Sequence, residues 1–127
     1  MNPNIIITLG LTERENEIVR KNFPNEEYEL IIAETFTDVL ALVYTTAIIN
    51  ADALTKGERE TMLSYYEEFV TSLNETICWI GYPLPTIELL NAIKYYERFE
   101  QLERNIKLFL QKAHYLYEKP KNFFNEL

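Results

Sequence analysis

The residues of this chain that could do chemistry do not form any of the common catalytic or metal-binding arrangements. His114 is the single histidine and Cys78 the single cysteine, so no Cys/His metal cluster and no Ser-His-Asp or Cys-His arrangement is identifiable. The three glycines are not spaced as a phosphate-binding loop. The remaining candidates are polar residues that follow apolar runs: Asn50 and Asp52 after one run, and Lys119 after another. We therefore expect no metal and no other cofactor.

Short apolar runs predict the elements that position these residues. Five runs rich in β-branched or aromatic residues predict strands at residues 4–9, 28–33, 47–50, 76–80 and 115–117. Helix starts lie between them, with capping boxes that begin at Thr12 and Thr55 and an N-cap at Thr86. Strands that alternate with helices predict right-handed βαβ units. We expect one domain, residues 1–127, with an α/β doubly wound five-stranded parallel sheet.

Ligand sites in doubly wound folds lie beyond the carboxyl ends of the strands. This rule predicts a candidate site made of Gly10–Thr12, Asn50–Asp52, Ile80–Tyr82 and Lys119. Asn50 and Asp52 are two residues apart, so their side chains leave the same face of an extended segment.

The segment between the predicted fourth and fifth strands is longer than one crossover helix requires. A helical pattern runs from Ile87 to about Ala113, roughly 40 Å at ~1.5 Å per residue. Its apolar residues have the spacing of a heptad seam, interrupted by Glu103. We expect an enlarged fourth helix that either splits near Arg104–Asn105 and packs on its own domain, or projects and pairs with a second copy. Residues 122–127 leave room for only a short or truncated final helix.

In the second case, residues 95–112 form a homodimer interface. Its predicted side chains are Tyr96, Phe99, Leu102, Ile106 and Phe109.

Over nearly the whole chain, the order of elements resembles the receiver domain of bacterial response regulators. The segment Ala113-His114-Tyr115-Leu116-Tyr117-Glu118-Lys119-Pro120 is similar to the last strand of that family, which ends in Lys-Pro. Residues 28–34 resemble its second strand with an Ala-Glu exit, and Gly57 lies near the glycine that opens its third helix. The resemblance implies a flavodoxin-like sheet with strand order 2-1-3-4-5.

The resemblance also implies that the phosphorylation chemistry of the family is missing. Receiver domains use an acid pair that binds Mg²⁺, a phosphoaccepting aspartate, a hydroxyl residue and a lysine. Here Gly10–Thr12 replace the acid pair and Asn50 replaces the phosphoacceptor. Ile80 replaces the hydroxyl residue, and only Lys119 is retained. We interpret the chain as a degenerate receiver, or pseudo-receiver, that is not an enzyme.

Composition narrows the possible partners. The net charge of −8, from 20 acidic and 12 basic residues, argues against binding to nucleic acid and to anionic membranes. The apolar run at residues 5–7 is too short for a signal peptide, and no run approaches the ~20 apolar residues of a membrane span. We expect a cytoplasmic protein.

Three functions are compatible with these features. We favour a phosphorylation-independent, receiver-like module of signal transduction that binds a second copy or another signalling protein. The first alternative is an active phosphoacceptor that uses Asp52, with Glu13 as a metal ligand. The second is a small-molecule sensor at the strand ends, lined by Trp79, Tyr82 and Tyr44.

Overall fold

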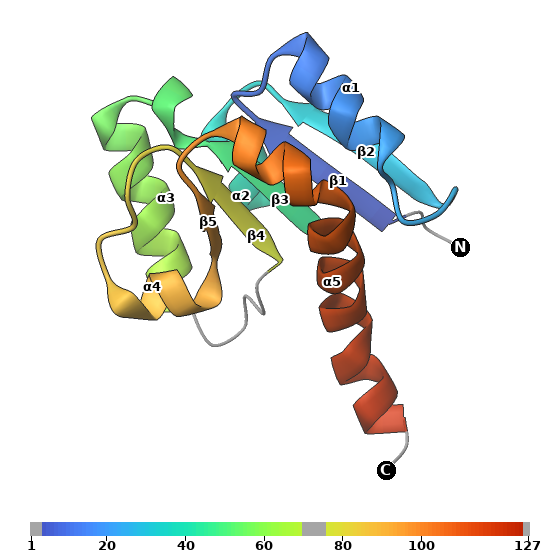
Figure 1. Ribbon diagram of the computed structural model, residues 1–127. Helices are drawn as coiled ribbons and strands as arrows, with labels where there is room; N and C mark the ends of the chain where they lie inside the picture. Colours follow the sequence, from blue (N-terminus) through green and yellow to red (C-terminus); the bar gives the residue numbers. More distant parts are fainter. Residues whose placement is uncertain (1–3, 70–75, 126–127) are drawn as a thin grey trace.

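Figure 1 shows a central parallel sheet with helices packed on both of its faces. This computed structural model describes residues 4–69 and 76–125, with side chains described up to residue 115. The strands are β1 (Asn4–Leu9), β2 (Tyr28–Ala33), β3 (Thr46–Asn50), β4 (Ile77–Ile80) and β5 (Lys94–Tyr96). The helices are α1 (Glu13–Lys21), α2 (Phe36–Ala41), α3 (Lys56–Glu68), α4 (Ile87–Ala92) and α5 (Phe99–Asn125), with a short 3₁₀ helix η1 (Ala51–Ala53).

The strand order is β2-β1-β3-β4-β5, and every neighbouring pair is parallel. This confirms the predicted doubly wound α/β sheet with order 2-1-3-4-5. β1, β3 and β4 are interior strands covered on both faces, which explains why they appear in the sequence as almost unbroken apolar runs. The direction of winding changes between β1 and β3, so their carboxyl ends form the topological switch point.

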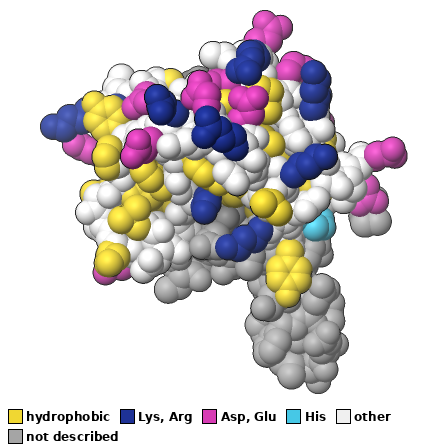
Figure 2. Space-filling view, in the orientation of Figure 1, with side chains coloured by type: hydrophobic (Ala, Val, Ile, Leu, Met, Phe, Trp, Pro, Cys, Tyr) yellow, Lys and Arg dark blue, Asp and Glu magenta, His cyan; other side chains and the backbone are white. Residues whose placement is uncertain are grey.

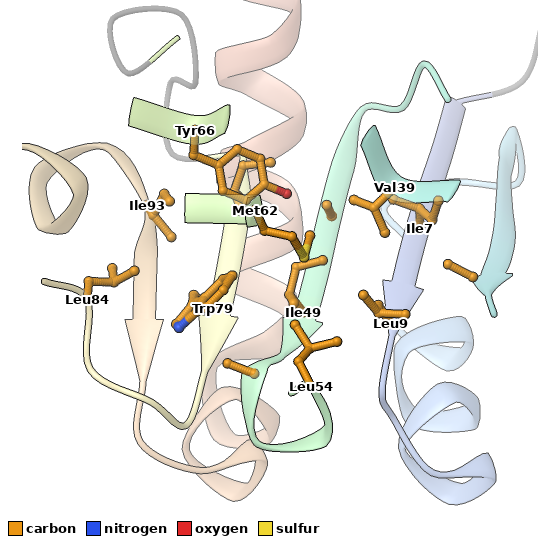
Figure 3. Packing of buried hydrophobic residues seen from close by; sticks show 14 of the residues in the cluster. Ile7, Leu9, Val39, Ile49, Leu54, Met62, Tyr66, Trp79, Leu84 and Ile93 are labelled. Carbon is orange, nitrogen blue, oxygen red and sulfur yellow. The ribbon is translucent and has the colours of Figure 1, made fainter. Parts of the chain in front are cut away.

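Two hydrophobic clusters lie on opposite faces of the sheet. One packs α2, α3 and α4 on the sheet, and Figure 3 shows Trp79, Met62 and Ile49 together within it. The other packs α1 and α5 on the opposite face and includes Ile48 and the fully buried Cys78. Burial raises the pKa of the Cys78 thiol, so this cysteine is held in its unreactive neutral form.

Side-chain caps fix where three helices begin, as the sequence predicts. The Thr12 hydroxyl accepts a hydrogen bond from the Glu15 amide, and Thr55 forms the same capping box with Glu58. The Thr86 hydroxyl accepts a hydrogen bond from the Leu89 amide at the start of α4. Each cap satisfies an amide that has no partner inside its helix.

The predicted fifth strand is wrong. Residues 113–120 lie inside α5, and the actual β5 is the three-residue segment Lys94–Tyr96, within the predicted long helix. Tyr95 packs against one hydrophobic cluster and Tyr96 against the other, so successive side chains of β5 do face opposite sides of the sheet. Three residues are too few for this alternation to be distinguished from a helical pattern in the sequence. The side-chain carbonyl of Gln101 accepts hydrogen bonds from the amides of Glu97 and Arg98, and this cap starts α5 just after β5.

The predicted enlargement of the fourth helix and the short final helix are also wrong. α4 has six residues, whereas the final helix α5 has 27. The first part of α5 covers the sheet, and Figure 1 shows the remainder extending past the ends at which the strands begin. At that edge His114 of α5 is hydrogen-bonded to Tyr28 at the start of β2. No helix in the described part of the chain is long and apolar enough to cross a membrane.

Most of the side chains predicted for a homodimer interface lie instead in the core of their own chain. The exposed fractions are 5% for Phe99, 0% for Leu102, 4% for Ile106 and 7% for Phe109. All four pack against the sheet from α5. Tyr96 alone is partly exposed, on the edge strand β5.

Candidate functional site

Asn50 ends β3 at the switch point and is hydrogen-bonded at both ends of its side-chain amide. Its Nδ2 donates to the carbonyl oxygen of Gly10 over 3.1 Å, and its Oδ1 accepts from the amide of Asp52 over 3.2 Å. Asn50 therefore joins the exit of β1 to the start of η1 and caps that 3₁₀ helix. In this position the amide acts as a structural brace.

The exit of β1 is packed tightly against the same loop. Gly10 has φ +80°, and a β-carbon there would lie 2.8 Å from Cβ of Ala53 and 2.9 Å from the carbonyl oxygen of Asn50. The next two residues have other roles, because Leu11 packs against the α1–α5 cluster and Thr12 caps α1. At the place where the receiver family has its acid pair, Gly10 is therefore packed closely against Asn50 and Ala53.

The end of β4 is bonded to β5. Ile80 is buried, and its side chain belongs to the hydrophobic cluster on the α5 face of the sheet. Gly81 has φ +101°; its amide donates to the carbonyl oxygen of Tyr96 over 3.0 Å, and its own carbonyl oxygen accepts from the Tyr95 hydroxyl over 2.5 Å. These bonds hold the β4–α4 loop against the sheet edge.

Asp52 lies in η1 with its carboxylate directly beside Gly81. A β-carbon on Gly81 would lie 2.5 Å from Cγ of Asp52. Partial burial raises the pKa of Tyr95, and the negative charges of Glu97 and Asp52 raise it further. Two carboxylates therefore act on the same tyrosine at the carboxyl ends of β3 and β5.

Within the described ranges, no group of three or more His, Cys, Asp and Glu side chains is placed to hold an ion. Glu13, the alternative metal ligand, begins α1 as an exposed residue.

Lys119 is not at the strand ends, contrary to the prediction. It lies 20 residues into α5 from Phe99, about 30 Å along the helix at ~1.5 Å per residue. α5 starts near the carboxyl ends of the strands and runs back past their amino ends, so Lys119 lies beyond the opposite edge of the sheet (Figure 1). Its side chain lies outside the described part of the chain.

The three aromatic residues predicted for a sensor pocket do not meet. Trp79 is fully buried in the core, where its Nε1 donates to the carbonyl oxygen of Tyr82 over 2.8 Å. Tyr82 is half-exposed at the carboxyl ends of the strands, and the Arg59 guanidinium lies 3.5 Å from its ring centroid. Tyr44 precedes β3 and so lies at the amino ends of the strands, next to Tyr66.

The sequence did not predict a hollow on the α5 face, between β5 and α5. It has a volume of about 270 Å³ and is lined by Lys94, Tyr96, Asn105, Leu108, Phe109 and Lys112. We call it the β5–α5 groove. The sequence could not predict this groove, because the pattern at residues 87–113 indicated one continuous helix, whereas β5 and α5 form the two walls.

Comparison with known proteins identifies no family. No protein-family model matches the chain, and no curated protein matches it in sequence. The features that the structure shares with the predicted receiver fold are the parallel sheet and its strand order.

Proposed function

We propose that this protein is a phosphorylation-independent, receiver-like module that acts by binding another macromolecule. The observation that carries the proposal is the bonding of Asn50. A phosphoacceptor at the end of β3 requires a carboxylate with a reactive oxygen. The residue at that position is an amide whose nitrogen is bonded to Gly10 and whose oxygen is bonded to the amide of Asp52.

The charges at the strand ends also disfavour a phosphoryl group. A phosphoryl group brings about 1.5 to 2 negative charges at neutral pH. Asp52 and Glu97 act on the same tyrosine at this edge. In the described part of the chain they belong to no cluster of three or more potential ligands for a Mg²⁺ ion that would offset their charge. Lys119, the cation predicted to balance that charge, lies in the far part of α5.

The partner in this proposal is another signalling protein or a second copy of the chain. The loops after β3 and β4 pack together at the strand ends, so partner binding would use another surface. The β5–α5 groove is a candidate for that surface. We include a cytoplasmic location in the proposal.

A titration with Mg²⁺ followed by beryllofluoride, a phosphoryl mimic, tests the proposal. We expect the amide resonances of residues 10–12, 50–52 and 80–82 to keep their positions in spectra of the ¹⁵N-labelled protein. A saturable shift centred on Asp52, lost in Asp52→Asn, would contradict the proposal and support an active phosphoacceptor.

A further inference from the structure

The charge of this chain is divided unevenly along the sequence. Residues 94–127 hold seven of the 12 Lys and Arg residues but only five of the 20 Asp and Glu residues. This part is therefore net positive, in a protein whose net charge is −8. Figure 2 shows dark-blue basic side chains across the face that α5 covers; acidic side chains lie among them towards the top of the view, and hydrophobic ones lie beside them lower down.

The β5–α5 groove combines this positive charge with an apolar lining. Lys94 and Tyr96 come from the same side of β5, and the Lys94 ammonium lies 5.5 Å from the centroid of the Tyr96 ring. From α5, Leu108 and Phe109 supply apolar surface and Lys112 supplies a second ammonium group. Leu108 is 69% exposed although it borders this hollow. A large apolar side chain is thus exposed to water in a hollow that two lysines also line.

We propose that the β5–α5 groove binds an acidic segment of a partner protein, which places an apolar side chain against Leu108 and Tyr96. The inference rests on the proposed function, since it names the partner of the binding module. The groove volume of about 270 Å³ falls below the range of roughly 300–1,000 Å³ usual for small-molecule sites. A single anchoring side chain suits a hollow of this size. Carboxylates on the segment complement the two lysines.

The edge position of β5 favours an extended segment. β5 is the last strand in the order β2-β1-β3-β4-β5, so its outer edge can pair with a further strand. An extended peptide alternates its side chains between two faces. Acidic residues on such a peptide can therefore face the lysines on either side of an apolar anchor.

Charge argues against a second copy in this groove. A two-fold dimer places the same patch of both subunits face to face. Lys94 and Lys112 of one copy would then meet the same lysines of the other, and like charges repel. An acidic partner meets no such penalty.

The test measures the binding of short fluorescein-labelled peptides by fluorescence anisotropy. The probe alternates Glu with Leu; one control peptide alternates Lys with Leu and another alternates Glu with Ser. We expect the Glu–Leu peptide alone to bind, more weakly as salt is raised. Leu108→Glu should weaken binding about tenfold or more, because it removes the apolar contact and adds a repelling charge.

Matched variants separate the groove from general surface effects. Ile87 on α4 is also 69% exposed, and Ile87→Glu should leave binding unchanged. Lys94→Glu should weaken binding about as much as Leu108→Glu, whereas Lys56→Glu on α3 should not.

Four results would overturn the inference. These are no binding of the Glu–Leu peptide, equal binding of the Lys–Leu peptide, equal losses in Leu108→Glu and Ile87→Glu, or self-association that Leu108→Glu abolishes. None of them bears on Asn50, so the proposed function would survive them. A beryllofluoride shift at Asp52, in contrast, would contradict the proposed function whatever the peptides do.

Discussion

The carboxylate of Asp52 lies against the α-carbon of Gly81, so two loops at the strand ends fit together only because residue 81 has no side chain. A β-carbon on Gly81 would lie 2.5 Å from both Cγ and Oδ2 of Asp52. Gly81 also has φ +101°, a conformation that residues with a side chain rarely adopt. The turn after β3 and the turn after β4 are thus packed together at the place where a phosphorylation site would need space.

Gly81→Ala is expected to lower the free energy of unfolding by about 1–3 kcal/mol, through backbone strain and the contact with Asp52. Urea denaturation followed by circular dichroism measures the change. Gly57→Ala is the control: Gly57 lies in the first turn of α3 with no atom within 4 Å of the added β-carbon. We expect that variant to be more stable by about 0.5–1 kcal/mol. Equal stability of the two variants would show that the loops do not pack as described.

Asn50→Asp is expected to lower the free energy of unfolding by about 1–2 kcal/mol, because Asp has no Nδ2 to donate to the carbonyl oxygen of Gly10. The new carboxylate would instead face that carbonyl oxygen. Asn25→Asp is the matched control, since Oδ1 of Asn25 only accepts a hydrogen bond, from the Glu27 amide, and Asp can accept it equally well. The brace between β1 and β3 would be refuted if both variants unfolded at the same urea concentration.

Leu102→Ala is expected to destabilise the protein by about 2–5 kcal/mol, because Leu102 is fully buried between α5 and the sheet. Leu108→Ala, on the exposed side of α5, should change stability by less than about 0.5 kcal/mol. Light scattering gives the oligomeric mass of both variants, which shows whether Leu102 acts in the core or in a dimer interface. A change in oligomeric mass for Leu102→Ala, with unchanged stability, would restore the predicted dimer interface.

Stability is expected to fall at alkaline pH because of Tyr66. Burial raises the pKa of Tyr66 well above 10.0, and the neighbouring Tyr44 raises it further. In the unfolded chain this tyrosine loses its proton near pH 10, whereas the folded protein keeps it protonated. Stability is therefore unaffected by this group below about pH 9 and decreases as the pH rises from about 10 towards the folded pKa.

Tyr66→Phe should flatten that alkaline decrease, which urea unfolding at about pH 8 and about pH 11 measures. The Tyr66 hydroxyl is buried and has no hydrogen-bond partner at normal geometry, although Tyr44 is close enough to affect its pKa. At about pH 8 the variant should therefore be as stable as the wild type or slightly more stable. An unchanged alkaline slope in Tyr66→Phe would assign the decrease to other groups.

Local sequence signals were sufficient for four strands and three helix starts. Interior strands are covered on both faces, so their apolar runs are unbroken, and capping side chains such as Thr12 act on amides only three residues away. The prediction missed β5 because a strand of three residues is too short to show an alternation of buried and exposed side chains. Residues 115–117 resembled a strand because two tyrosines flank Leu116, but they continue α5.

In the candidate site, too, the sequence predicted local features but missed contacts between distant residues. The position of Asn50 at the end of β3 followed from the sequence, whereas its bond to Gly10, 40 residues away, depends on which strands are neighbours. The β5–α5 groove was out of reach for the same reason. Lys94 and Lys112 become neighbours only when α5 folds back along β5.

The central claim is that the strand ends of this protein do not accept a phosphoryl group. The most direct test is the intact mass of the protein after incubation with acetyl phosphate and Mg²⁺. We predict an unchanged mass for the wild type and for Asp52→Asn. A gain of one phosphoryl group in the wild type, located on Asp52 and absent from Asp52→Asn, would contradict the claim.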